Sequence, residues 1–157
     1  MTEYAVPIVA IIFLVILNGL FVAAEFALAR ARTTRLEAKA EEGSRAAALG
    51  ARQVGDIDRY LAACQLGITL ASLGLGWIAE PAFGSLIEPA LEALGVGHAP
   101  SILVAGILAF LIITFLHVVI GELAPKTIAI RRAEATTQVL ARPLEGFGRL
   151  FQPAIFV

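Results

Sequence analysis

The sequence predicts an all-α membrane protein with three transmembrane helices and cytoplasmic amphipathic helices that lie beside the membrane. Of its 157 residues, 59% are hydrophobic and 16% are charged, whereas ordinary soluble domains contain roughly 25% charged residues. Three apolar stretches are long enough to cross roughly 30 Å of hydrocarbon at about 1.5 Å per helical residue. The basic residues are all on one side of these stretches. Together these observations favour a multi-pass protein of the plasma membrane.

The three predicted spans cover about residues 6–29, 60–79 and 101–120. The first is interrupted only by Asn18 and Glu25. The second is the least apolar of the three, since it contains polar side chains and several glycines. We therefore expect the second span to be buried against the other two, where small and polar residues favour helix contacts.

The lysines and arginines predict the orientation of the chain. Seven lie between the first and second spans and five follow the third span, whereas the connection over residues 80–100 contains none. By the positive-inside rule the basic side is the cytoplasm. This orientation places the N-terminus outside and the C-terminus in the cytoplasm.

The composition also limits the partners of the chain. A net charge of −1 gives no reason to expect a nucleic acid partner. The single cysteine, Cys64, excludes an intrachain disulfide and a cysteine-based zinc cluster. It lies in an apolar stretch, where we expect it to be a small packing residue.

The connecting segments have different characters. Residues 31–58 predict a cytoplasmic amphipathic helix, or a pair of helices broken near Gly43 or Gly50. Residues 81–99 are rich in proline and glycine and predict a partly helical outer loop. Residues 126–142 predict a second cytoplasmic helix.

Two polar residues of the first span need an explanation, because an ionisable group at the centre of a membrane helix costs about 2.5–3.5 kcal/mol on insertion scales. Asn18 and Glu25 are seven residues apart and therefore share one helical face. Two interpretations of Glu25 stay open. It pairs with an arginine such as Arg30 or Arg32 near the cytoplasmic interface, or it belongs to an ion path.

The second span contains a polar stripe. Gln65, Thr69, Ser72 and Gly76 follow i, i+4, i+7 and i+11 spacing, which places them along one face. Such side chains often form only hydrogen bonds across helix contacts, and the alternative is that they are ion ligands. For His117 in the third span three interpretations stay open: a structural hydrogen bond, a proton-linked role or metal binding.

The stretch "HVVIGELAPKTIAI", residues 117–130, gives a more specific signal. Pro125 has no N–H, so the Gly121 carbonyl loses its usual helical partner and Ala124 is pushed away from helical geometry. A broken membrane helix beside a carboxylate such as Glu122 is typical of cation sites in transporters. The alternative is a helix that ends at the interface with a local Glu122–Lys126 pair.

Hard cations such as Mg²⁺ and Na⁺ prefer oxygen ligands. The oxygen donors that the sequence offers near Pro125 and on the facing spans are Glu122, the Gly121 carbonyl, Thr69, Ser72, Asn18 and Gln65.

Three motifs resemble the transmembrane domain of CNNM/CorC proteins, also called hemolysin-like membrane proteins. They are "NGLFVAAEFALARARTTRLE", "LAACQLGITLASLGLGWIAEP" and "HVVIGELAPKTIAI". The resemblance implies divalent-cation transport, usually Mg²⁺ export coupled to Na⁺ entry, by a homodimer with three transmembrane helices per subunit. It also implies cytoplasmic CBS modules and a small C-terminal domain, which this sequence lacks. The chain departs from the family pattern at Val22 and Ile68, where many members have serine and asparagine at the proposed Mg²⁺ site.

The main hypothesis is therefore a divalent-cation transporter. Glu122 supplies the charge, the Gly121 carbonyl and the Thr69 hydroxyl are further ligands, and Lys126 anchors the helix end or pairs with an acidic group. Asn18 and Ser72 either bind the cation directly or support its ligands, and Gln65 and Ser72 are candidates to compensate for the ligands lost at Val22 and Ile68. The alternative is a non-transporting dimeric anchor or sensor that positions the cytoplasmic CBS domains. We do not expect an enzyme, because the sequence has no His-Glu-x-x-His motif, no paired intramembrane aspartates and no serine with an evident base.

Overall fold

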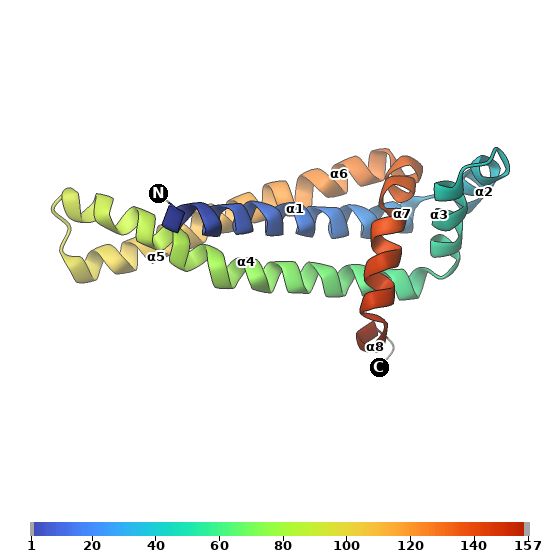
Figure 1. Ribbon diagram of the computed structural model, residues 1–157. Helices are drawn as coiled ribbons and strands as arrows, with labels where there is room; N and C mark the ends of the chain where they lie inside the picture. Colours follow the sequence, from blue (N-terminus) through green and yellow to red (C-terminus); the bar gives the residue numbers. More distant parts are fainter. Residues whose placement is uncertain (1, 156–157) are drawn as a thin grey trace.

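The computed structural model describes residues 2–155, which form a sequence of helices (Figure 1). Their order and bounds are α1 (Thr2–Arg30), α2 (Thr33–Glu41), α3 (Arg45–Gly55), α4 (Ile57–Ala93), α5 (His98–Leu116), the π-helix η1 (His117–Leu123), α6 (Ala124–Arg131), α7 (Ala133–Leu150) and α8 (Gln152–Ile155). In Figure 1, α1, α4 and the α5–α6 rod run side by side, and α7 crosses them at the end where α2 and α3 lie.

Three helical stretches of the described chain are long and apolar enough to cross a membrane. They are Ala5–Arg30, Ile57–Ala93 and His98–Arg131. Large apolar side chains lie exposed on α1 and α5, for example Phe13 and Phe110, which are both 60% exposed. In water such a surface would be unfavourable, whereas in a bilayer it faces hydrocarbon. The prediction of an all-α membrane protein with three transmembrane helices is confirmed.

The first span, rather than the second, is the central helix of the bundle. Helix α1 packs against α4, η1, α6 and α7, because its small residues allow close approach. A Cβ atom added at Gly19 would lie only 2.9 Å from Pro125 Cγ. Helix α4 in turn packs against both α1 and α5, which agrees with the expectation that the second span lies against the other two.

Helices α1 and α4 meet at a glycine that a side chain cannot replace without movement. A Cβ atom added at Gly67 would lie 2.6 Å from carbons of the Phe21 ring. We expect Gly67→Ala to lower the free energy of unfolding by about 1–3 kcal/mol, because overpacking moves the ring or separates the helices. The measurement is the midpoint of thermal or SDS-induced unfolding.

Gly76 provides the matched control on the same helix. A Cβ atom added there would meet nothing within 4 Å among the described residues, and alanine favours the helix by roughly 1 kcal/mol. Gly76→Ala should therefore keep or raise the midpoint. Equal midpoints for the Gly67 and Gly76 variants would contradict the tight contact between α1 and α4.

The connection after the first span forms a pair of helices, which was one of the two predicted alternatives for residues 31–58. Helix α2 ends at Glu41 and α3 begins at Arg45. The break is at Gly43, whose φ of +99° is accessible mainly to glycine. Gly50 instead lies inside α3, where an added Cβ would be 2.9 Å from Thr137 Cγ2 on α7. The second glycine is therefore a packing position and not a break.

The structure differs from the expected helix bounds in two places. Helix α4 continues to Ala93 through Pro81 and Pro89, so that residues 81–93 are helical and the loop is confined to about residues 94–97. Membrane helices tolerate such prolines. The helix predicted to begin at residue 126 does not begin there, since residues 124–131 continue the third span and the break is at Arg132, with φ −131° and ψ 46°.

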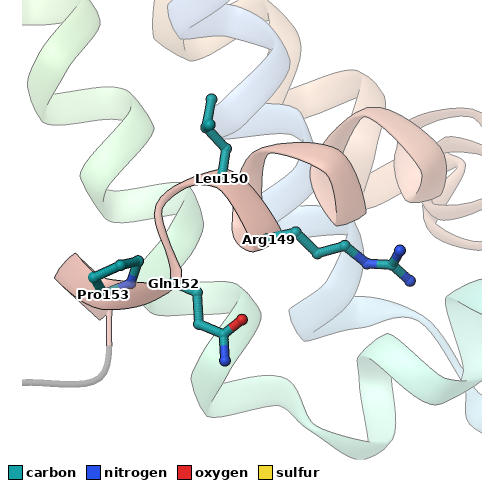
Figure 2. Close-up of a pocket in the computed structure, with 4 residues that line it drawn as sticks. All are labelled: Arg149, Leu150, Gln152 and Pro153. Atoms are coloured by element: carbon teal, nitrogen blue, oxygen red, sulfur yellow. The ribbon is translucent and has the colours of Figure 1, made fainter.

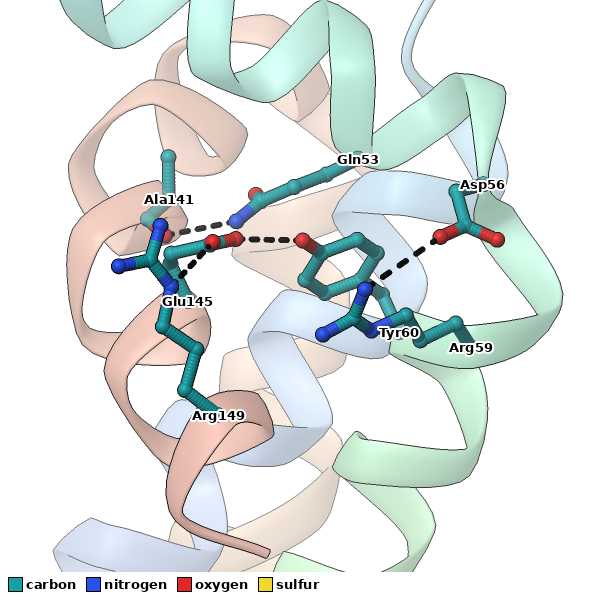
Figure 3. Close-up of polar contacts among 7 residues, drawn as sticks. All are labelled: Gln53, Asp56, Arg59, Tyr60, Ala141, Glu145 and Arg149. Atoms are coloured by element: carbon teal, nitrogen blue, oxygen red, sulfur yellow. Dashed lines mark hydrogen bonds and ion pairs between the residues drawn. The ribbon is translucent and has the colours of Figure 1, made fainter. Parts of the chain in front are cut away.

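A polar network ties α3, α4 and α7 together at the end of the bundle that contains most basic residues (Figure 3). The Tyr60 hydroxyl donates to Glu145 Oε2, and Arg149 Nε donates to Glu145 Oε1 at 2.8 Å. The fully buried Gln53 donates from Nε2 to the Ala141 carbonyl at 2.7 Å. Through these bonds α7 is held on α3 and on the end of the membrane-spanning helix α4.

The Glu145 carboxylate links this network to pH. The hydrogen bond from Tyr60, followed by those from Arg149, lowers the pKa of Glu145 although its partial burial raises it. A lowered folded-state pKa contributes stability above the ordinary carboxyl pKa of about 4.3, and that stability is lost as the pH falls through the lowered value. We expect Tyr60→Phe to lower the unfolding midpoint at pH 7, with a difference from the native chain that shrinks in acid.

Thermal unfolding between pH 7 and pH 3 checks this prediction. Arg149→Gln serves as the control, because the Arg149 side chain is 72% exposed and an exposed ion pair is worth about 0–1 kcal/mol. Its effect should be smaller than that of Tyr60→Phe. A Tyr60→Phe difference that grows as the pH falls would contradict the assigned role of Glu145.

Candidate cation-binding site

A cavity of about 220 Å³ lies inside the membrane-spanning part of the bundle, between α1, α4 and η1. Its lining residues are Asn18, Val22, Glu25, Phe26, Ile68, Ser72, His117 and Glu122. Five of them, on three separate helices, were singled out in the sequence as candidate site residues or as polar interruptions of the spans: Asn18, Glu25, Ser72, His117 and Glu122. The fold therefore brings together polar groups that are up to 104 residues apart (Asn18 and Glu122).

The turn before Pro125 keeps helical geometry, contrary to the predicted break. Ala124 has φ −66° and ψ −50°, and its N–H donates to the Val119 carbonyl five residues earlier. A proline ring clashes with the carbonyl four residues before it in an α-helix. The wider π-turn of His117–Leu123 relieves this clash, so the chain passes Pro125 without changing to an extended conformation.

The Gly121 carbonyl is nevertheless exceptional, as predicted, because Pro125 has no N–H to give it. The buried Asn18 supplies the missing donor, with its Nδ2 atom 2.9 Å from Gly121 O. The other end of the amide accepts from Ser72 Oγ at 3.3 Å, and Ser72 Oγ lies 3.5 Å from His117 Nε2. One hydrogen-bonded chain thus joins α1, α4 and η1 around the cavity.

Two carboxylates line the same cavity. Glu122 is exposed and Glu25 is half-buried, and among the described residues neither forms an ion pair with a lysine or arginine. Of the two interpretations of Glu25, pairing with Arg30 or Arg32 is not observed. Glu25 and His117 are the residues that the predicted ligand set missed. Their positions along the helices could have identified both residues in the sequence. Glu25 lies seven residues after Asn18, and His117 lies four residues before Gly121, so each shares a helical face with a predicted site residue.

Lys126 does not pair with Glu122. Its ammonium lies over the Phe26 ring, 4.4 Å from the ring centroid, in a cation–π contact. The Lys126 side chain therefore links α6 to α1 and leaves the Glu122 charge uncompensated. The predicted Glu122–Lys126 pair is wrong, whereas an anchoring role for Lys126 agrees with this contact.

Two predicted ligands, Gln65 and Thr69, lie outside the cavity. Both side chains are exposed on α4, and Thr69 Oγ1 donates to the Gln65 carbonyl of its own helix at 2.8 Å. The small residues of α4, such as Ala63 and Ala71, face the interior. The polar stripe lies on the flank of that face, and of the expected α4 ligands Ser72 alone lines the cavity.

The cavity wall also contains the two positions at which the sequence departs from the resembled family. Val22 is 3% exposed and Ile68 is half-buried, and both line the cavity. The remaining oxygen donors are the side chains of Asn18, Glu25, Ser72 and Glu122 and the Gly121 carbonyl. Mg²⁺ usually keeps several waters and binds through one or two carboxylates, so this donor set fits a partly hydrated ion.

A larger pocket of about 590 Å³ lies at the turn between α7 and α8 (Figure 2). Its lining residues are Arg149, Leu150, Gln152 and Pro153. These residues include a guanidinium and an amide but no carboxylate, so they provide no negative charge to bind a cation. The cavity around Asn18 and Glu122 is therefore the stronger candidate.

The fold and the cavity define a multi-pass membrane domain that places unpaired carboxylates within its spans. The family model "Cyclin M transmembrane N-terminal domain" matches residues 9–157, and the chain belongs to this CNNM family. The predicted resemblance is thus confirmed over nearly the whole chain.

Curated bacterial relatives agree with the family. The chain is 48% identical to the UPF0053 protein YhdT of Bacillus subtilis over 92% of its own length and 31% of the relative. It is 43% identical to YhdP of the same organism, over 97% of this chain and 34% of the relative. It is 39% identical to the Mycobacterium tuberculosis protein Rv1841c, over 88% of this chain and 39% of the relative. The chain therefore spans about a third of the length of the relatives it matches.

Proposed function

We propose that the domain transports a divalent cation, with Mg²⁺ as the first candidate, through the cavity between α1, α4 and η1. The observation that carries this proposal is the pair of carboxylates, Glu25 and Glu122, that line one cavity without a described lysine or arginine partner. Ionisable groups inside membrane spans are costly and usually mark ion or substrate paths.

The donor set supports a hard cation. Glu122 contributes the principal charge, and Glu25 adds a second one near the same cavity. Asn18 and Ser72 orient the Gly121 carbonyl through their hydrogen bonds. When the ion binds, the second lone pair of that carbonyl and waters of the ion complete the coordination. Na⁺ is the candidate coupling ion, since it prefers the same oxygen chemistry.

The π-helix supports a conformational role. π-turns occur frequently at functional sites, and η1 contains His117, Gly121 and Glu122, three residues of the site. A change between the π and α registers of this segment would rotate Glu122 relative to Asn18. We propose this rotation as the step that exchanges access between the two sides of the membrane.

The exposed polar face of α4 supports a homodimer. Gln65 and Thr69 are exposed between apolar positions of a membrane-spanning helix, where lipid is a poor environment for them. We propose that a second copy covers this face. In the plasma membrane, the basic end with α2, α3 and α7 would face the cytoplasm.

The alternative function is a non-transporting anchor or sensor for cytoplasmic domains such as CBS modules. The observation that favours it is the polar network that holds α7 on α3 and α4, because such a network transmits movement between the membrane helices and whatever follows. This alternative requires no ion flux.

Flux separates the two functions. Proteoliposomes with an enclosed Mg²⁺-sensitive dye are compared with protein-free liposomes, with and without an opposing Na⁺ gradient, for this chain and for the full-length protein. The transporter proposal expects Mg²⁺ flux that exceeds the protein-free leak. Absence of flux from folded full-length protein would favour the anchor or sensor.

A further inference from the structure

A second group of metal-ligating side chains lies at the opposite end of the bundle, where α4 meets α5. Glu88 and Glu92 are one turn apart on α4, and His98 is the first residue of α5. His98 Nδ1 lies 2.5 Å from Glu92 Oε1 and 3.4 Å from Glu88 Oε1. The three ligand atoms all lie within 4.8 Å of one another, although they come from two helices.

The carboxylates of this cluster have no permanent counter-charge nearby in the sequence. The chain contains no lysine or arginine between Arg59 and Lys126. In Figure 1 the turn between α4 and α5 lies at the end of the molecule away from α2, α3 and α7. Two carboxylates that converge at such a place attract a cation, and the His98 imidazole lies beside both of them.

We propose that Glu88, Glu92 and His98 form a binding site for a divalent transition-metal ion of the Zn²⁺ type. An imidazole together with carboxylates suits Zn²⁺, Co²⁺ or Cu²⁺ better than Mg²⁺, which prefers oxygen ligands alone. Three protein ligands with water in the fourth position are a common arrangement for Zn²⁺. This site is separate from the cavity and does not depend on the proposed transport function.

The geometry is compatible with this ion after a small movement. Ligand bonds of about 2.0–2.2 Å in a tetrahedron place the ligand atoms about 3.4 Å apart. The His98–Glu88 separation already has this value. The shorter His98–Glu92 separation has to widen by about 1 Å, and the exposed Glu92 side chain can rotate to do so. The metal would then clamp the last turns of α4 to the first turn of α5.

The backbone of the turn holds the ligands in register. Gly95 has φ +87°, which reverses the chain direction within a few residues. Ser101 Oγ donates to the Val96 carbonyl at 3.2 Å, and Ser101 is fully buried. The first turn of α5 is therefore fixed relative to the loop, which limits the separation of His98 from α4.

Zn²⁺ titration calorimetry on the tag-free chain in detergent tests the site. We expect one Zn²⁺ site at neutral pH, and at least tenfold weaker binding in His98→Ala, Glu88→Gln and Glu92→Gln. Since these side chains are partly or well exposed, the variants should fold, which the unfolding midpoint verifies. The matched control is Glu41→Gln on α2, which removes an exposed carboxylate outside the cluster and should keep the Zn²⁺ affinity.

Cu²⁺ as a spectroscopic probe assigns the nitrogen ligand. The chain has only two histidines, His98 and His117, so pulsed EPR of the Cu²⁺-loaded chain can distinguish them. The proposal expects the imidazole nitrogen signal to vanish in His98→Ala and to persist in His117→Ala. A native chain without a Zn²⁺ site, unchanged affinity in the three ligand variants, or a nitrogen signal that depends on His117 alone would overturn the proposal.

Discussion

Glu122→Gln should reduce cation-dependent flux at least tenfold while the protein stays folded. The substitution keeps the shape of the side chain but removes the charge that lines the cavity. A tenfold loss corresponds to about 1.4 kcal/mol, which is modest for the removal of one charged ligand of a divalent ion. The measurement is the initial rate of Mg²⁺ movement in dye-loaded proteoliposomes at equal protein content.

Two control variants accompany this experiment. Glu41→Gln removes an exposed carboxylate outside the membrane spans and should leave the flux unchanged. Glu25→Gln removes the second carboxylate of the cavity and should reduce the flux to an intermediate level. Native flux in Glu122→Gln would show that this residue does not contribute the charge of the site, even if the domain transports ions.

Asn18→Ala should destabilise the bundle by about 1–3 kcal/mol. The Asn18 side chain is 1% exposed and supplies the donor that Pro125 cannot give to the Gly121 carbonyl. Its removal leaves a buried carbonyl without that partner, which costs about 1–3 kcal/mol. The measurement is SDS-induced or thermal unfolding in detergent, with the intrinsic fluorescence of Trp77 as one reporter.

Ser72→Ala is the matched control for the Asn18 experiment. It removes the 3.3 Å hydrogen bond to Asn18 Oδ1 but leaves the bond to Gly121 intact. Its effect on the unfolding midpoint should be clearly smaller. If the two variants had the same midpoint as the native chain, the Gly121 carbonyl would have another partner, and the explanation of the π-turn would fail.

The membrane spans and the exceptional carbonyl could be predicted from the sequence because both depend on local properties. Apolar length determines whether a helix spans the bilayer, and the missing N–H of Pro125 affects Gly121 whatever the surroundings. The geometry at Ala124 could not be predicted in this way. The clash caused by a proline ring can be relieved either by an extended residue before it or by a π-turn. In this chain the π-turn relieves it, and Pro125 packs against Gly19 of α1.

The contents of the cavity depend on how the helices are rotated against one another, which local patterns describe poorly. Helix α4 has two adjacent faces of similar character, one with the polar stripe and one with small residues. The small residues of α4 face the interior, and this leaves Thr69 outside and Ser72 at the cavity. Likewise, the position of Phe26 on α1 determines that Lys126 contacts a ring instead of Glu122. Spacing alone favours Glu122, which is four residues before Lys126, whereas the contact with Phe26 depends on how α6 packs against α1.

The end of the third helical stretch at Arg131 could also not be predicted from the sequence. Arg132 has neither the glycine nor the proline that usually marks a helix end. The chain bends there because α7 packs across α1 and α3. Tertiary packing, rather than propensity, determines this boundary.

Diffraction from crystals soaked in Mn²⁺, a stand-in for Mg²⁺ with an anomalous signal, tests the central claim most directly. The account predicts an anomalous peak in the cavity between α1, α4 and η1, within coordination distance of a Glu122 carboxylate oxygen, and loss of that peak in Glu122→Gln. A peak at the Glu88–Glu92–His98 cluster is compatible with the proposed second site, but it does not replace the peak that is expected in the cavity. Occupancy at that cluster alone, with no peak in the cavity at saturating Mn²⁺, would contradict the claim.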